Sequence, residues 1–235
     1  MHRLSLLSLL VFLAAASLHA ADSIELTAAL KALPASETAI QLFNGTDLTG
    51  WDGAPDFWSV EDGAIKGTNE KEVPSSTCLF TRESYRQFRL LMEVKQTISP
   101  KHSTMHSAVA ALGERFTDKG ENAHGFRGPL LMFCHDWGIW DANRRNRVEP
   151  AGQSGPMPLA AERKGEWNLI EIVVIGDRIR FAANGAQVFD FTDKPGMLRE
   201  SPIGLQLHAN TKPQEWRFRG LVLTRNPEDR MVTLK

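Results

Sequence analysis

The stretch WNLIEIVVIGDRIRFAANGAQVFDF, residues 167–191, holds three apolar runs separated by two short turns. The turns Ile175-Gly176-Asp177-Arg178 and Ala183-Asn184-Gly185-Ala186 contain Gly and Asn, which accept the positive φ angles that tight hairpins impose. Because each turn is so short, the runs on either side of it are expected to pair antiparallel. The stretch therefore predicts three consecutive antiparallel strands at 167–175, 178–183 and 186–191.

Similar β-like runs and turn residues continue on both sides of this stretch, without alternating helices. This pattern is typical of an all-β antiparallel sandwich rather than an α/β sheet. An N-terminal arm at 21–37 differs, because apolar residues at near-helical spacing before Pro34 predict a small helix packed at the sandwich edge. The sandwich is expected to occupy 38–225, followed by a C-terminal tail at 226–235. The further predicted strands include 87–96, 107–112, 129–134, 202–208 and 215–223.

Residues 1–20 have the pattern of a secretory signal peptide. His2 and Arg3 precede an apolar run at 4–16, and Leu18-His19-Ala20 offers a cleavage site. The run is shorter than a membrane-spanning helix, and no later segment approaches the necessary length of about 18 apolar residues. We therefore expect an exported protein, secreted or periplasmic, without a membrane span; an uncleaved anchor is the alternative.

Charge, cysteine content and missing motifs narrow the function classes. The formal net charge is −1 without a basic stripe, which argues against nucleic-acid binding and fits an uncharged ligand such as a neutral sugar. Cys78 and Cys134 lie in apolar runs and are expected as buried free thiols, a disulfide between them being the alternative. The absence of G-x-S-x-G, phosphate-loop, H-E-x-x-H and C-x-x-C motifs gives no support to serine hydrolases, nucleotide-dependent enzymes or zinc proteases.

Strand parity places several polar side chains on faces opposite the core. In the run at 203–208 the aliphatic residues point one way, and Gln206 and His208 point the other way. In the next run Arg217 shares its parity with Glu215 and Arg219, which gives a second polar stripe. A solvated sheet face is the alternative interpretation of both stripes.

A second polar cluster follows the apolar run at 129–134 and is expected at one mouth of the sandwich. Aromatic faces suit a sugar ring, arginines suit hydroxyl groups, and an imidazole or carboxylate can transfer protons. The alternative is that the tryptophans cap the core and the arginines are solvated. Histidines also gather in this part of the chain, at His102, His106, His124 and His135. The expected cluster contains His135, Asp136, Trp137, Trp140 and Asp141, followed by Asn143, Arg144, Arg145, Asn146 and Arg147.

Five segments spread along the chain resemble one known family. In their order and spacing they are similar to the 3-keto-disaccharide hydrolase domain family, formerly domain of unknown function 1080, across residues 38–225. The resemblance implies a concanavalin A-like lectin/glucanase sandwich, or jelly roll, which binds ligands on its concave sheet. Family members carry a glutamate where this chain has Leu130. The segments are LFNGTDLTGW (42–51), FWSVEDGAIKG (57–67), GEWN (165–168), ANGAQVFDF (183–191) and IGLQLH (203–208).

The resemblance implies an exported glycosidase-like enzyme that cleaves 3-keto-glycosides or 3-keto-disaccharides. A ketone at C3 acidifies the C2 proton, so a base can remove this proton, the C1 substituent is eliminated, and water addition completes net hydrolysis. The expected catalytic residues are His135, Asp136 and His208. The residues expected to bind the carbohydrate are Trp137, Trp140, Asp141, Arg144, Arg145, Gln206 and Arg217.

The sequence leaves open both which group polarises the ketone and whether the protein is this enzyme. Either Arg and Gln donors or a divalent metal ion could stabilise an enediolate oxygen, and the ligands of such a metal stay open. A non-catalytic carbohydrate-binding sandwich is the alternative function that the missing glutamate favours. A glycoside hydrolase with a carboxylate pair is a third function, weakened by the absence of an E-x-D-x-x-E strand. The oligomeric state is also left open.

Overall fold

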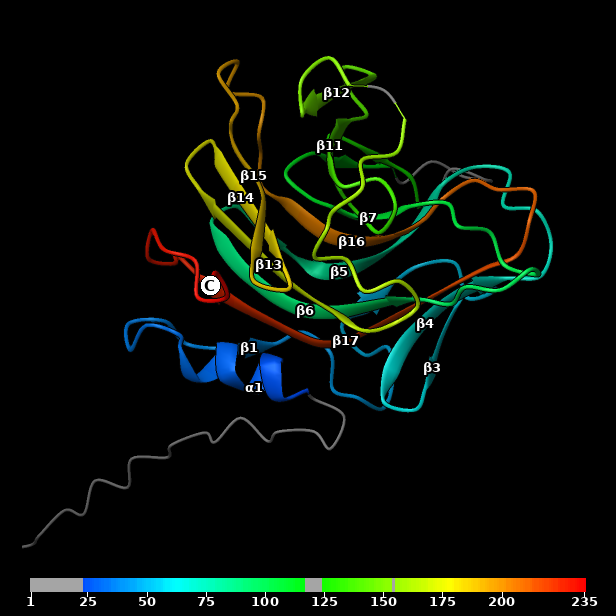
Figure 1. The fold of residues 1–235 in the computed structure, drawn as a ribbon, viewed down its shortest axis with the longest axis horizontal. Coiled ribbons are helices and arrows are strands. Elements are labelled where there is room, and N and C mark those ends of the chain that lie inside the picture. The colour runs from blue at the N-terminus through cyan, green and yellow to red at the C-terminus, as the bar shows by residue number, and fades with distance from the viewer. Residues whose placement is uncertain (1–22, 117–123, 154) are drawn as a thin grey trace, which may run out of the picture.

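The structure is a computed structural model that describes residues 23–116, 124–153 and 155–235. Two antiparallel sheets lie face to face, and the one helix of the described residues lies outside them (Figure 1). This arrangement confirms the all-β antiparallel sandwich predicted from the sequence. The predicted signal peptide at 1–20 lies outside the described residues. Within the described ranges, no helix is long and apolar enough to cross a membrane.

One sheet has eight strands and forms the layer next to the helix (Figure 1). Its strands are β1 (Ile40–Gln41), β3 (Trp58–Glu61), β4 (Ala64–Asn69), β6 (Phe88–Gln96), β13 (Asn168–Ile175), β14 (Arg178–Ala183), β15 (Ala186–Thr192) and β17 (Gln214–Arg225). Their order is β15-β14-β13-β6-β17-β4-β3, and β1 pairs with β17. The two tight turns that join β13, β14 and β15 hold Gly176 and Asn184 at φ of 57° and 52°. The three-strand meander therefore follows from the turn residues, as predicted.

The facing sheet has seven strands and carries the cavity described below. Its strands are β2 (Trp51–Asp52), β5 (Thr77–Tyr85), β7 (Ser107–Ala110), β10 (Pro129–Phe133), β11 (Gly138–Asp141), β12 (Asn146–Glu149) and β16 (Ser201–Leu207). Their order is β12-β11-β10-β7-β16-β5-β2. A separate two-stranded ladder, β8 (Glu114–Arg115) and β9 (Phe126–Arg127), lies in the connection between β7 and β10.

The main core lies between the two sheets, where buried apolar side chains of both sheets pack together. From the seven-stranded sheet, Phe133 packs edge-on against Trp216 and Phe218 of β17, at ring-centroid distances of 5.8 Å and 6.2 Å. All three are fully buried. Along β10, Leu131 and Phe133 face this core, whereas Leu130 and Met132 belong to a second cluster on the other face of the seven-stranded sheet.

The N-terminal helix α1 (Ile24–Lys31) begins at Ser23, whose hydroxyl accepts a hydrogen bond from the Leu26 N–H. The helix packs through Leu26 on Leu91 of β6 and Leu169 of β13. The predicted small helix is present, but its expected position at the sandwich edge is wrong. It covers the outer face of the eight-stranded sheet, because Leu91 and Leu169 leave an apolar patch there for Leu26 to bury.

Candidate active site

A cavity of about 710 Å³ lies on the outward face of the seven-stranded sheet. Its floor is the second apolar cluster of the structure, in which parity turns alternate residues of β5, β7 and β10 away from the main core. The loop around β8 and β9 adds Phe116 and Phe126 to the wall. Polar side chains occupy one end of this cavity. The floor residues are Cys78, Phe80, Ala108, Ala110, Leu130 and Met132.

Three side chains at the polar end form a chain of contacts. The carboxylate of Asp136 pairs with the guanidinium of Arg147, and its second oxygen lies 3.3 Å from Nδ1 of His106. Burial, reinforced by His208 and Arg147, lowers the pKa of His106 to about 3. With this lowered pKa, His106 is neutral at pH 7.

His208 stands next to His106, and the two imidazole rings meet edge to face with centroids 4.5 Å apart. Nδ1 of His208 lies 2.6 Å from the carbonyl oxygen of Ala209. A carbonyl can only accept a hydrogen bond, so Nδ1 carries the proton in the neutral ring and Nε2 keeps its lone pair. The backbone carbonyl of His208 in turn accepts a 2.7 Å hydrogen bond from Gln214. The ring is thus fixed in a tautomer that can act as a base at Nε2.

Two buried polar atoms on cavity-lining residues have no hydrogen-bond partner within the described part of the chain: Nε of Arg147 and Oε1 of Gln206. Such atoms cost free energy unless a ligand or water satisfies them. Arg147 reaches the cavity by crossing Gly138, where a Cβ atom would lie 2.7 Å from its Nη1. The guanidinium is held by the carbonyl oxygens of Trp137 and Gly155, each at 3.2 Å.

The structure brings four of the sequence-predicted site residues to this cavity: Asp136, Trp140, Gln206 and His208. Gln206, in β16, and His208, directly after the end of β16, lie on the same side of the sheet, as parity predicted. Sequence reasoning placed Arg147 in the polar cluster without selecting it as a binding residue, and gave His106 no role in the site. The clustering of histidines was a correct indication for His106, whereas nothing local distinguished Arg147 from the neighbouring arginines.

His135 and Trp137 do not line the cavity. Cys134 and His135 adopt φ of 53° and 69°, so the chain turns sharply after β10 and the expected common mouth does not form. His135 is exposed, while Trp137 is buried in the main core and donates a 2.9 Å hydrogen bond from Nε1 to Glu162. For Trp137 the alternative interpretation, a tryptophan that caps the core, is correct.

The remaining predicted binding residues also lie away from the cavity. Asp141 accepts hydrogen bonds from the backbone N–H groups of Asn143 and Arg144 and so shapes the turn after β11. Arg144 bridges Asp141 and Asp193, and Arg145 is exposed. Arg217 belongs to the eight-stranded sheet.

The contacts of Arg217 explain why it does not reach the site. On β17, it pairs with Glu61 and Glu215, at 2.5 Å and 2.9 Å. Parity correctly placed Arg217 on an outward face, but that face belongs to the sheet that does not carry the cavity. A single sequence does not reveal which of two sheets a strand joins.

The residues of the cavity do not fit a divalent metal ion. Within the described ranges, no group of three or more His, Cys, Asp or Glu side chains could hold one. Asp136, the carboxylate among the described lining residues, is occupied by the guanidinium of Arg147. The positive charge beside the two imidazoles is therefore that of arginine.

Both cysteines are buried and free, as the sequence predicted. Cys78 lies in the floor of the cavity and Cys134 in the main core. Burial raises the pKa of the Cys78 thiol to about 12, so this thiol is not a nucleophile at neutral pH.

Residues 38–224 match the family model of the 3-keto-alpha-glucoside-1,2-lyase-like domain. The chain belongs to this family. The resemblance predicted from the five sequence segments is thereby confirmed. A 3-keto-disaccharide hydrolase of Bacteroides thetaiotaomicron is 23% identical over 172 residues, which cover 65% of this chain and 58% of that protein. The match thus spans less than two thirds of that relative.

Solved structures of low sequence identity share the fold of this family member. A candidate glycosyl hydrolase from Parabacteroides distasonis superposes with a TM-score of 0.56 at 19% identity, covering 79% of this chain and 93% of that one. The carbohydrate-binding module CBM66 from Bacillus subtilis gives 0.52 at 13%, covering 74% and 95%. The kappa-carrageenase of Pseudoalteromonas carrageenovora gives 0.53 at 12%, covering 81% and 96%. These likenesses confirm the concanavalin A-like sandwich.

Proposed function

We propose that this protein is an exported enzyme that cleaves 3-keto-glycosides by removing the C2 proton and eliminating the C1 substituent. The observation that carries the proposal is the polar end of the cavity. There, the neutral His208 tautomer leaves Nε2 free to accept a proton. Nε of Arg147 and Oε1 of Gln206 have no hydrogen-bond partner among the described residues. The family match supplies the substrate class. Export rests on the sequence pattern of residues 1–20.

The proposed reaction begins when Nε2 of His208 takes the C2 proton. The electron pair of the broken C2–H bond forms a C2=C3 double bond, and negative charge moves to the former ketone oxygen at C3. The guanidinium of Arg147 faces this charge through its free Nε–H, while Oε1 of Gln206 accepts a sugar hydroxyl. Donors held in place before charge develops stabilise such an oxyanion without reorganisation.

Elimination completes the proposed step. The C3 carbonyl re-forms, a C1=C2 double bond appears, and the C1–O bond breaks. The departing oxygen takes the proton from the His208 imidazolium, so the residue returns to its starting state. Addition of water across C1=C2 then gives net hydrolysis, whereas release before hydration makes the enzyme a lyase.

His106 has a positioning role in this proposal. Asp136 faces its Nδ1, and its ring lies edge-on to His208. Because its pKa is lowered to about 3, His106 stays neutral when His208 gains a proton. A second imidazolium 4.5 Å away would oppose that protonation.

A non-catalytic sugar-binding sandwich remains the second candidate function. It is favoured by the likeness to CBM66 in fold and by Leu130 in place of the family glutamate. The partly exposed imidazole pair, next to Arg147, favours the enzyme, because binding alone needs no base. A carboxylate-pair glycosidase has no support, since Asp136 is the carboxylate among the described lining residues and two are needed.

Incubation with a 3-keto-glucoside and with its unoxidised parent tests the proposal. We expect aglycone release from the oxidised compound alone. His208→Ala should lower turnover at least about 100-fold, the low end of a general-base contribution, without changing the melting temperature. His135→Ala, an exposed histidine outside the cavity, is the matched control and should keep parental turnover. Binding of the 3-keto-glucoside without turnover by the parent protein would instead favour the binding module.

A further inference from the structure

The cavity is divided between a polar end and an apolar end, and strand register fixes their order. Across the sheet, Trp140 pairs with Leu130, Leu130 with Ala110, and Ala110 with Gly204. Two residues further along β16, Gln206 pairs with Cys78, and His208 follows beyond the end of that strand. Two residues of a strand span about 7 Å. Leu130, Ala110 and Gly204 thus form one row across the sheet. His208 lies four residues after Gly204, so it is separated from this row along the strand by roughly twice that length.

Among the described residues, the apolar end offers a ligand almost no hydrogen bonds. Its floor side chain is Leu130, while Cys78 and Met132 lie between Leu130 and His208, in the same row as Gln206; all three are less than 10% exposed. Phe116, Phe126 and Trp140 form the walls, and their only polar atom is the indole nitrogen of Trp140. Phe126 packs on Phe80 of the floor at a centroid distance of 6.1 Å. The guanidinium of Arg115, 4.8 Å from the Phe80 ring centroid, pairs with Asp52, although its Nε has no partner among the described residues.

This division limits what the C1 substituent can be. If the oxidised sugar lies beside His208, Gln206 and Arg147, the substituent extends over the apolar floor. A second sugar there would bury several hydroxyl groups, and each unpaired one costs about 1–3 kcal/mol. A hydrocarbon substituent gains about 25 cal/mol for each Å² that it removes from water.

We infer that the substrates are 3-keto-glycosides of apolar alcohols or phenols, rather than 3-keto-disaccharides. The inference rests on the proposed function for the orientation of the sugar. It goes further in naming the leaving group, which is selected by Leu130, Met132, Phe126 and Trp140. An apolar leaving group also keeps water from the C1–C2 bond during elimination.

Binding of unoxidised compounds tests the inference separately from turnover. Cyclohexylmethyl glucoside and a 1→6-linked glucose disaccharide of the same anomeric configuration are titrated by calorimetry, in both the α and the β series. We expect the cyclohexylmethyl compound to bind at least about tenfold more tightly in the preferred series. Equal affinities, tighter binding of the disaccharide, or no binding of either compound at millimolar concentration overturns the inference.

Turnover of the 3-keto forms of the same two compounds gives the second measurement. Both leaving groups are primary alcohols, so a difference in kcat/KM reports recognition and not leaving-group chemistry. Turnover of the two forms at similar kcat/KM contradicts the inference while supporting the proposed function. Cleavage of neither, with preferential binding of the cyclohexylmethyl compound intact, contradicts only the proposed function.

Leu130→Asn places an amide in the apolar floor at similar volume and should reduce the preference about tenfold. Ile98→Asn makes the same kind of change at a side chain that is 46% exposed and outside the cavity, and should leave the preference unchanged. If Leu130→Asn does not fold, the partly exposed Trp140→Gln serves in its place. An unchanged preference in a folded cavity variant overturns the assignment of these residues.

Discussion

The neutral state of His106 depends on the groups that surround its ring in the candidate site. Its Nδ1 lies 3.3 Å from Asp136, a distance at which a carboxylate ordinarily favours the imidazolium. Burial and the nearby Arg147 act in the opposite direction and lower the pKa of His106 to about 3. Arg147 thus contacts Asp136 and also opposes the protonation of His106, although it lies in β12, far along the chain from His106.

The free energy of unfolding should depend on pH through His106. Its pKa is about 3 in the folded protein and about 6.5 when unfolded, so between these values the unfolded chain binds more protons. The contribution is present above pH 6.5 and is lost as the pH falls, by about 2 kcal/mol at pH 5. Urea unfolding at pH 7 and pH 5 should thus show a larger loss of stability for the parent protein than for His106→Asn.

A pH of 5 keeps most carboxylates ionised, which isolates the histidine effect. His102→Asn is the control, because His102 lies in the same stretch of sequence but outside the cavity. Its stability should follow the parent protein between the two pH values. Parallel pH dependence of the parent and His106→Asn would show that His106 is solvated and can take up a proton.

At the level of elements, strands were predictable and their sheet membership was not. Alternation and Asn-Gly or Gly-Asp turns placed β13, β14, β15 and β16 to within about two residues. They also placed Gln206 and His208 on the face opposite the core, because parity is a local property. The sequence left open which sheet each strand joins, and Arg217 therefore lies on the wrong sheet for the site.

The residues after β10 show a second limit of sequence analysis. Parity continues only while the backbone stays extended, and Cys134 and His135 leave that conformation with positive φ. The turn exposes His135, buries Trp137 in the core and leaves Asp136 facing Arg147. A non-glycine residue with positive φ has no reliable local sequence signature, so this rearrangement was not predictable.

The hairpin of β11 and β12 depends on one glycine. Gly138 has a φ of 142°, and a Cβ there would lie 2.3 Å from the Glu149 carbonyl oxygen and 2.7 Å from Nη1 of Arg147. Gly138→Ala should therefore cost about 3 kcal/mol in the free energy of unfolding and displace Arg147 from Asp136. Chemical denaturation measures the first effect, and the kcat for a 3-keto-glucoside measures the second.

Gly152→Ala is the matched control for this variant. Gly152 also has a positive φ, 71°, but no atom lies within 4 Å of the position its Cβ would take. Its substitution should lower the free energy of unfolding by only about 1 kcal/mol, the cost of placing a Cβ on a left-handed backbone, and should leave kcat unchanged. Equal losses at the two positions would mean that the close approach of Arg147 to Gly138 does not constrain the hairpin.

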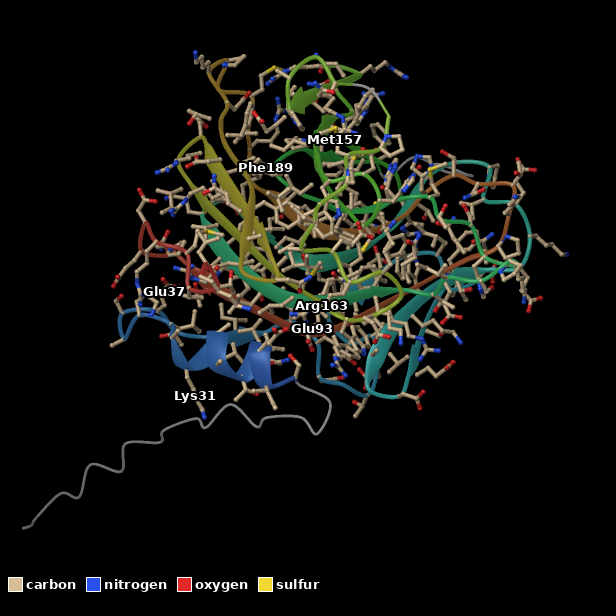
Figure 2. The ribbon with its side chains drawn as sticks, viewed as in Figure 1. Lys31, Glu37, Glu93, Met157, Arg163 and Phe189 are labelled. Atoms are coloured by element: carbon tan, nitrogen blue, oxygen red, sulfur yellow. The ribbon has the colours of Figure 1, made fainter. Side chains whose placement is uncertain are left out.

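For the whole molecule, a buried ion cluster joins both ends of the described chain to the sandwich. Arg89 of β6 is fully buried and pairs with Glu171 of β13 and, at 2.8 Å, with Glu37, which follows α1 (Figure 2). Arg89 also donates to the carbonyl oxygen of Arg230 in the C-terminal tail, at 2.8 Å. Figure 1 shows this tail on the same side of the eight-stranded sheet as α1. The cluster lies opposite the cavity, so it stabilises the sheet without entering the site.

Glu171→Gln tests whether this cluster determines the stability of the whole sandwich. Oε1 and Oε2 of Glu171 accept hydrogen bonds from the backbone of Val232 and Thr233 at 2.8–3.0 Å, and the carboxylate balances the charge of Arg89. Removing one partner of a buried pair leaves an uncompensated charge, so we expect a loss of about 3 kcal/mol and faster proteolysis of the tail. Glu83→Gln breaks the exposed pair with Arg225, in which Glu83 is 70% exposed, and should cost less than about 1 kcal/mol. Similar small losses for both variants would mean that Glu37 alone compensates Arg89, and that the tail is held by the packing of Val232 against Leu26 and Leu169.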